Sequence, residues 1–115
     1  MVLDKQDNRN YIVIIKDVRF EWDTVKNISN KTKHDVYFEE AATVFSDKLY
    51  LEITDPDHSQ NEDRFIALGI SENCRLLVVC HSVLHDENTV RIISARKATL
   101  NEEKQYGELT NAKRI

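Results

Sequence analysis

Apolar residues recur at two different spacings along the chain, and the changes of spacing predict the order of its elements. The stretch from Tyr11 to Trp22 has the β-branched runs and the alternation of a strand, and Lys16-Asp17 divides it into either two strands or a hairpin. Residues 1–10 are polar and charged and are expected to form a leader. The ordered part of the chain is therefore expected to begin with strand structure.

The spacing changes to that of a helix after Asp23, which is a favourable N-cap residue. Val25, Ile28 and Ser29 follow Trp22 at helical spacing and are expected to share one side of this helix. The polar side is expected to carry Lys26, Asn30 and Lys33. Basic residues favour the C-terminal end of a helix, so the helix is expected to end near residues 33–35.

A second helix is predicted from about Phe38 to Phe45. Its core-facing stripe, at spacings i, i+3, i+4 and i+7, consists of Phe38, Ala41, Ala42 and Phe45. Glu39 and Glu40 lie in its first turn, where the helix dipole favours negative charge. This pattern predicts a short helix packed on the core.

Short strands separated by turns are predicted next, at residues 49–54, 64–70, 75–82 and 90–95. The turns include residues 55–58, 71–74 and 85–88. Thr99 and Glu102 form a capping box that opens a last helix, expected to end near Leu109. The order predicts one α+β domain, residues 11–110, with an antiparallel β-sheet, two helices after the first strand and one C-terminal helix. Residues 111–115 are expected to form a frayed tail.

Composition narrows the function classes. The 115 residues suffice for a single core, and 16 basic against 20 acidic side chains give a net charge of −4. This acidity argues against general nucleic-acid binding, although a small active site needs only a local cluster of cations. Cys74 and Cys80 make no disulfide framework, and neither a signal peptide nor a membrane-length apolar run is present. A cytoplasmic location without a membrane partner is expected.

His34, next to Lys33, is the first candidate for chemistry, because histidine titrates near neutral pH and serves as a general base or acid. Arg64 is the second, because its planar guanidinium can bind phosphate. Each has a simpler structural alternative: a surface or loop-capping histidine, and an arginine that forms a salt bridge to Glu62 or Asp63.

The stretch from Arg91 to Arg96 is the most suggestive. Strict alternation would put Ile92, Ser94 and Arg96 on one strand face, so Ser94 and Arg96 are expected to point the same way. The alternative is an edge strand protected by its charges. Tyr106 on the last helix would face either the sheet or a partner.

Metal and cofactor chemistry is not expected. The four histidines share no tight ligand spacing, and the two cysteines form no C-x-x-C pair. No glycine-rich phosphate loop is present, and Ser94 has no nearby partners for a catalytic triad.

Taken together, the segments from about Phe20 to Tyr106 resemble the BrnT family of toxins. The matching residues include Phe20-Glu-Trp-Asp23, Lys26, Asn30, Lys33-His34, Phe38-Glu-Glu-Ala-Ala-Thr-Val-Phe45, Asp55, Asp57-His58, Arg64-Phe65, Gly69, Ser71, Leu76-Leu-Val-Val79 and His81. The strongest block is Arg91-Ile-Ile-Ser-Ala-Arg96 with Ala98, Glu102 and Tyr106. One departure is Asp35-Val-Tyr37, where the family tends to have Gly-Val-Ser, because Tyr37 cannot cap the second helix as serine would.

The resemblance implies a RelE-like fold and an RNA-cleaving toxin that blocks translation. It also implies a BrnA-like ribbon-helix-helix antitoxin as partner, with operator DNA contacted only through that antitoxin. On this basis we expect metal-independent cleavage in which the substrate 2′-hydroxyl attacks the adjacent phosphate. His34 would move a proton, Arg64 and Arg96 would bind the phosphate, and Ser94 would orient it. Lys33, Arg91 and Tyr106 are second candidates. The alternatives are a non-catalytic protein-interaction module and a zinc-binding domain.

Overall fold

The computed structural model describes residues 10–15, 17–56, 64–84 and 88–114, which form an α+β fold as predicted. The strands are β1 (Asn10–Ile15), β2 (Val18–Asp23), β3 (Leu51–Thr54), β4 (Arg64–Ile70), β5 (Leu76–Leu84) and β6 (Thr89–Lys97). The helices are α1 (Thr24–His34), α2 (Phe38–Thr43), the 3₁₀ helix η2 (Val44–Ser46) and α3 (Leu100–Arg114). Residues 1–9 of the expected leader, 57–58 of the turn at 55–58 and 85–87 of the turn at 85–88 lie outside the described residues. Within the described ranges, no helix is long and apolar enough to cross a membrane.

The strands form one sheet in the order β1-β2-β6-β5-β4-β3. β1 and β2 are an antiparallel hairpin, and Asp17 in its turn has a left-handed backbone with φ 70°. Of the two alternatives at Lys16-Asp17, the hairpin is therefore correct. As a consequence, α1 and α2 follow the second strand rather than the first.

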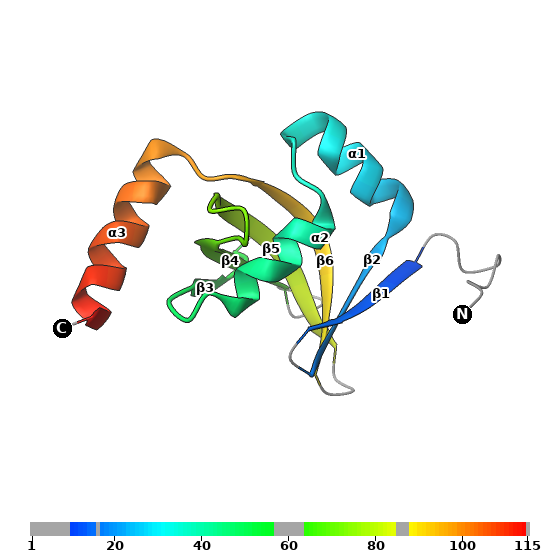
Figure 1. Cartoon of the computed structure of the whole chain (residues 1–115), viewed down its shortest axis with the longest axis horizontal. Coiled ribbons are helices and arrows are strands. Elements are labelled where there is room, and N and C mark those ends of the chain that lie inside the picture. The colour runs from blue at the N-terminus through cyan, green and yellow to red at the C-terminus, as the bar shows by residue number, and fades with distance from the viewer. Residues whose placement is uncertain (1–9, 16, 57–63, 85–87, 115) are drawn as a thin grey trace.

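The sheet is not wholly antiparallel, which corrects the expectation from the sequence. β2 and β6 run parallel, with Phe20 beside Val90, whereas each of the other four neighbouring pairs is antiparallel. Alternation of polar and apolar residues determines which face a side chain occupies, but it carries no information about the direction of the neighbouring strand. The long excursion through the helices and β3 to β5 brings β6 back beside β2 (Figure 1).

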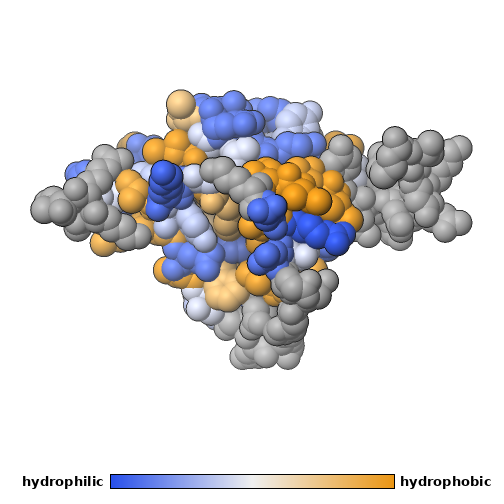
Figure 2. All heavy atoms as spheres, turned by 60° about the horizontal axis from the view of Figure 1, so that its bottom comes forward, coloured by the Kyte–Doolittle hydropathy of each residue, from blue (hydrophilic) through white to orange (hydrophobic). Residues whose placement is uncertain are grey.

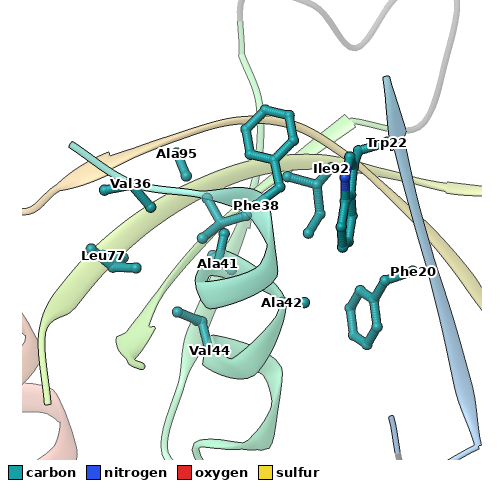
Figure 3. Close-up of a cluster of buried hydrophobic side chains, with 12 residues drawn as sticks. Phe20, Trp22, Val36, Phe38, Ala41, Ala42, Val44, Leu77, Ile92 and Ala95 are labelled. Atoms are coloured by element: carbon teal, nitrogen blue, oxygen red, sulfur yellow. The ribbon is translucent and has the colours of Figure 1, made fainter. Parts of the chain in front are cut away.

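The core lies between one face of the sheet and α2. Figure 3 shows Phe38, Ala41 and Ala42 of α2 in one buried cluster with Phe20 and Trp22 of β2. The Trp22 and Phe38 rings meet edge to face, with centroids 6.2 Å apart. The remaining core members are Val36, Val44, Ala67, Leu77, Val79, Ile92 and Ala95. The expected stripe on α2 is confirmed for its three fully buried members, and Phe45 packs against the cluster from η2.

α1 packs through polar side chains, contrary to the sequence-based assignment of its faces. Val25 and Ile28 are 62% and 59% exposed, whereas Asn27 and Asn30 are buried. The helix lies across the ends of β2 and β6, where backbone groups need hydrogen-bonding partners more than apolar contacts (Figure 1). Asn27 Oδ1 accepts the backbone N–H of Phe38 at 2.6 Å. This bond replaces the cap that Tyr37, as expected, does not provide.

Both predicted caps are present. The Asp23 carboxylate accepts the N–H groups of Val25 and Lys26, at 2.8 and 3.3 Å. Thr99 and Glu102 form the reciprocal bonds of a capping box at the start of α3. α3 continues to Arg114, beyond the expected end near Leu109, and Figure 1 shows it at one end of the molecule, apart from α1 and α2.

Candidate active site

The four residues of the expected catalytic set, His34, Arg64, Ser94 and Arg96, line one cavity of about 340 Å³. The lining residues of β4 and β5 alternate with the core residues Ala67, Leu77 and Val79, so they point to the sheet face opposite α2. His34, the last residue of α1, completes the cavity wall near the C-terminal end of β6. The other lining residues are Asp55, Ile66, Val78, Cys80, Ile93 and Ala95. Segments far apart in the sequence thus bring a histidine, a hydroxyl and two guanidinium groups to one place.

A β-bulge shapes the β6 wall of this cavity. Cys80 of β5 pairs with Ser94, but the next residue, His81, pairs with Ile92, so Ile93 is the extra residue. The bulge breaks the strict alternation expected for this strand: Ile92 and Ala95 are both buried in the core. The expectation that Ile92 shares a face with Ser94 is therefore wrong. Ser94 and Arg96 do line the same cavity, as expected.

Arg96 is held by an acidic partner on α3. Its two terminal nitrogens donate to the two carboxylate oxygens of Glu102, at 2.8 and 2.9 Å. This bidentate pairing raises the pKa of Arg96 and lowers the pKa of Glu102 to about 2. The Arg96 side chain is still 42% exposed, so its guanidinium is both oriented and accessible.

The position of His34 depends on the residue that follows it. Asp35 ends α1 in a left-handed conformation, with φ 61°, and its N–H donates to the carbonyl oxygen of Lys31. Its carboxylate forms ion pairs with Lys31, Lys97 and Arg75, and the hydrogen bond to Lys31 is the main reason why its pKa falls to about 2. These bonds tie the end of α1 to β6 and to the turn that precedes β5.

Arg75 extends these contacts into α2. Its guanidinium binds the buried carboxylate of Glu40, which also accepts a hydrogen bond from the hydroxyl of Ser71 at 2.6 Å. The bond from Arg75 lowers the pKa of Glu40. The end of α1, the start of α2 and the turn between β4 and β5 are therefore joined by one group of charges.

Two polar cavity residues, Asp55 and Cys80, are not among the site residues that the sequence predicts. Cys80 Sγ lies 3.7 Å from Asp55 Oδ2, and burial, together with the Asp55 charge, raises the pKa of the thiol. A thiol with a raised pKa is a poor nucleophile at neutral pH. The signal available in the sequence was the alternation of β5, which puts Cys80 on the same face as Val78.

The second candidates are not gathered with the main set. Lys33 lines an adjoining cavity, which shares His34, Ile93 and Ser94 with the first. Arg91 Nη1 donates to Glu21 on β2 at 2.6 Å, away from the cavity walls. Tyr106 lines a separate cavity between α3 and η2, where its hydroxyl donates to Asp47. The suggested salt-bridge partners of Arg64, Glu62 and Asp63, lie outside the described residues.

No curated protein matches the chain. Residues 22–102, which include all four cavity residues of the expected set, match the family described as the ribonuclease toxin BrnT of type II toxin–antitoxin systems. The match covers well over half of the chain, and we conclude that the chain belongs to the BrnT family of ribonuclease toxins.

Proposed function

We propose that this family member is an active endoribonuclease that cleaves RNA without a metal ion and thereby inhibits translation. The observation that carries the proposal is the single cavity that gathers His34, Arg64, Ser94 and Arg96. Cleavage of a phosphodiester by its own 2′-hydroxyl needs a group that moves protons and cations beside the phosphate, and these side chains supply both.

In the proposed reaction the 2′-hydroxyl loses its proton and its oxygen attacks the neighbouring phosphorus. The bond from phosphorus to the 5′-oxygen breaks, and that oxygen takes a proton as it leaves. The products are a 2′,3′-cyclic phosphate and a free 5′-hydroxyl. His34 moves one of the two protons, Arg64 and Arg96 stabilise the charge of the pentavalent phosphate, and Ser94 donates a hydrogen bond to a phosphate oxygen.

The protein environment supports these roles. Arg96 is fixed by Glu102, so it loses little side-chain freedom on meeting a phosphate. Asp35 fixes the end of α1 that carries His34. The apolar wall of Ile66, Val78 and Ile93 lowers local hydration, which strengthens the interaction between a guanidinium and an anion.

We further propose a RelE-like fold, a cytoplasmic site of action and neutralisation by a BrnA-like ribbon-helix-helix antitoxin. The free thiols of Cys74 and Cys80 suit a reducing compartment. Apolar side chains on the surface offer a protein partner contact area: Figure 2 shows a contiguous hydrophobic region beside strongly hydrophilic residues. On β1, at the edge of the sheet, Ile12 and Ile14 are 49% and 67% exposed. Any contact with operator DNA would be made by the antitoxin.

The test uses the purified chain, a single-stranded RNA and an excess of EDTA. We expect cleavage to continue in EDTA, to leave a 2′,3′-cyclic phosphate, and to fail on the all-2′-deoxy strand. His34→Ala should reduce the rate by roughly 10²–10⁴-fold. Lys104→Ala, which removes an exposed cation of α3 outside the cavity, is the control and should cut normally. Loss of cleavage in EDTA would reject the metal-free reaction. No RNA cleavage and no growth arrest on expression would favour the interaction module.

A further inference from the structure

A second cavity, of about 190 Å³, opens directly beside the candidate active site. Its lining residues are Lys26, Ser29, Asn30, Lys33, His34, Ile93 and Ser94. Three of them, His34, Ile93 and Ser94, also line the first cavity, so the two hollows meet at the proposed reaction centre. A chain-like ligand bound at that centre would continue into this second cavity.

The free side of the second cavity is positively charged. Lys26, Asn30 and Lys33 follow one another at i, i+4 and i+7, which puts them on one face of α1. Lys26 and Lys33 are exposed, and neither forms an ion pair with a residue that the structure describes. Lys31, on another face of the same helix, is by contrast paired with Asp35.

The charge of α1 is unusual for this protein. The chain as a whole has a net charge of −4, but Thr24–His34 contains three lysines and a histidine and no acidic residue. The capping carboxylate of Asp23 is engaged with backbone N–H groups at the start of the helix. The electrostatic potential beside this face of α1 therefore favours an anion, although the protein as a whole repels one.

The lysines are held at a fixed distance from the strand that carries Ser94. The buried amide of Asn30 donates to the carbonyl oxygens of Val36 and Ala95, both at 2.8 Å, and accepts the N–H of Ala95 at 3.2 Å. β2 pairs with β6 only as far as Arg91, so the Asn30 side chain takes the place of a neighbouring strand at Ala95. The α1 side of the cavity is therefore anchored to β6 through Asn30.

We propose that the second cavity binds the phosphodiester next to the scissile one, so that the preferred substrate is single-stranded RNA of at least three nucleotides. The inference rests on the proposed function, which assigns the scissile phosphate to the first cavity. Lysine is a compact point charge that binds phosphate without bidentate geometry, so the contact would be independent of base sequence. Lys26 is the residue that defines this subsite, because it lines the second cavity and not the first.

The first test compares cleavage of a ribodinucleotide with cleavage of trinucleotides that carry one further phosphodiester on either side of the scissile bond. The wild-type chain should cut one of the two trinucleotides with a higher kcat/KM than the dinucleotide. Lys26→Ala should remove roughly two- to fivefold of that advantage, the size expected for an exposed ion pair. Cleavage of the dinucleotide should be unchanged. Lys104→Ala is the matched control and should leave both rates unchanged.

The second test measures binding rather than cleavage, so it does not depend on the reaction. The probe is an all-2′-deoxy trinucleotide, and its affinity is measured at several salt concentrations. Loss of one phosphate contact should reduce the slope of log K against log salt by about 0.7 in Lys26→Ala. Equal slopes for wild type and Lys26→Ala, or equal wild-type rates on dinucleotide and trinucleotides, would overturn the subsite while the ribonuclease proposal stands. A reduced slope without any RNA cleavage would keep the subsite and reject the ribonuclease.

Discussion

The carboxylate of Glu102 binds the guanidinium of Arg96 through two hydrogen bonds and, with the same Oε1, accepts the backbone N–H of Thr99 at 2.8 Å. One side chain therefore starts α3 and orients an arginine of the candidate active site. The capping box, which normally serves only the helix, here connects the C-terminal helix to the proposed chemistry.

Arg64→Ala and Arg96→Ala should each abolish most RNA cleavage without unfolding the chain. Removing one preorganised donor to a developing charge typically costs about 10²–10³-fold in rate. The loss of a partly exposed ion pair costs at most about 1 kcal/mol of stability. The measurements are the initial cleavage rate and the melting temperature of each variant. Arg19→Ala, an exposed arginine of β2 outside the cavity, is the control. Variants that cut RNA at the wild-type rate would show that these arginines are only structural.

Glu102→Gln should reduce cleavage although it leaves every cavity residue in place. The amide cannot offer two acceptor oxygens to Arg96, so the guanidinium would be less well oriented, and misplacement by about 1 Å can cost on the order of 10²-fold. The change should appear in kcat more than in KM if orientation is the cause. Glu103→Gln, the exposed neighbour on α3, should leave kcat unchanged. An unchanged kcat in Glu102→Gln would mean that Arg96 needs no partner to act.

Stability should fall as the solution is acidified from about pH 4.5 to about pH 2. Ion pairing lowers the pKa of Glu102 from 4.5 to about 2, so the folded chain binds this proton more weakly than the unfolded chain. Protonation therefore favours unfolding. Urea unfolding at several pH values should show that the free energy of unfolding falls less with acidification in Glu102→Gln than in the wild type. His81, whose pKa is lowered by burial, acts in the same direction from about pH 6.5 downwards, but it is common to both proteins.

Asn30→Ala should destabilise the fold, because it leaves the backbone N–H and carbonyl of Ala95 without their partner. A buried backbone group that loses its hydrogen bond costs about 1–3 kcal/mol. Asn27 is equally buried but bonds to α2 instead of β6. Asn27→Ala should therefore also lower stability, whereas Asn30→Ala alone should impair the alignment of α1 with Ser94. The comparison of cleavage rates in folded samples of the two variants separates these effects.

Replacing Gly69 by alanine should lower the stability of the fold, whereas replacing Gly107 by alanine should raise it. A Cβ on Gly69 would lie 2.8 Å from Cγ1 of Val44 and 2.9 Å from Cβ of Tyr50, so Gly69→Ala should cost about 1–3 kcal/mol through overpacking. A Cβ on Gly107 would meet nothing within 4 Å, and alanine favours a helix by about 0.8–1 kcal/mol. Thermal unfolding of the two variants measures both changes. A stabilised Gly69→Ala would show that β4 and η2 can move apart readily.

Local signals in the sequence predicted the caps and the strands, because they depend on neighbouring residues. Asp23, Thr99 and Glu102 act as expected for this reason. The faces of α1 were assigned wrongly, since the usual apolar pattern presumes that a helix packs on side chains. α1 packs instead through asparagine side chains that bond to the backbone of β6 and of the first turn of α2. The parallel pairing of β2 and β6 depends on contacts about 70 residues apart, beyond the reach of local patterning.

The sequence predicts those parts of the candidate active site that depend on residue chemistry and on strand alternation. Ser94 and Arg96 share a cavity as the period of two requires. The bulge at Ile93 could not be foreseen, because it depends on how β5 meets β6 and no glycine or proline marks it. Asp55 and Cys80 lie beside Arg64 and Ser94 only because their segments pair with neighbouring strands. The carboxylate that binds Arg96 belongs to Glu102 on α3, which follows β6 in the sequence.

The parallel pairing of β2 with β6 also determines when the sheet and the candidate active site can assemble during synthesis. The β1–β2 hairpin leaves the ribosome early, but its neighbour in the sheet, β6, is made about 70 residues later, at a synthesis rate of roughly 5–20 residues per second. Closing so long a loop delays the central pairing relative to the local hairpins. Arg96 lies on that last strand and its partner Glu102 beyond it, so the nascent chain has no assembled cavity until residue 102 has been translated.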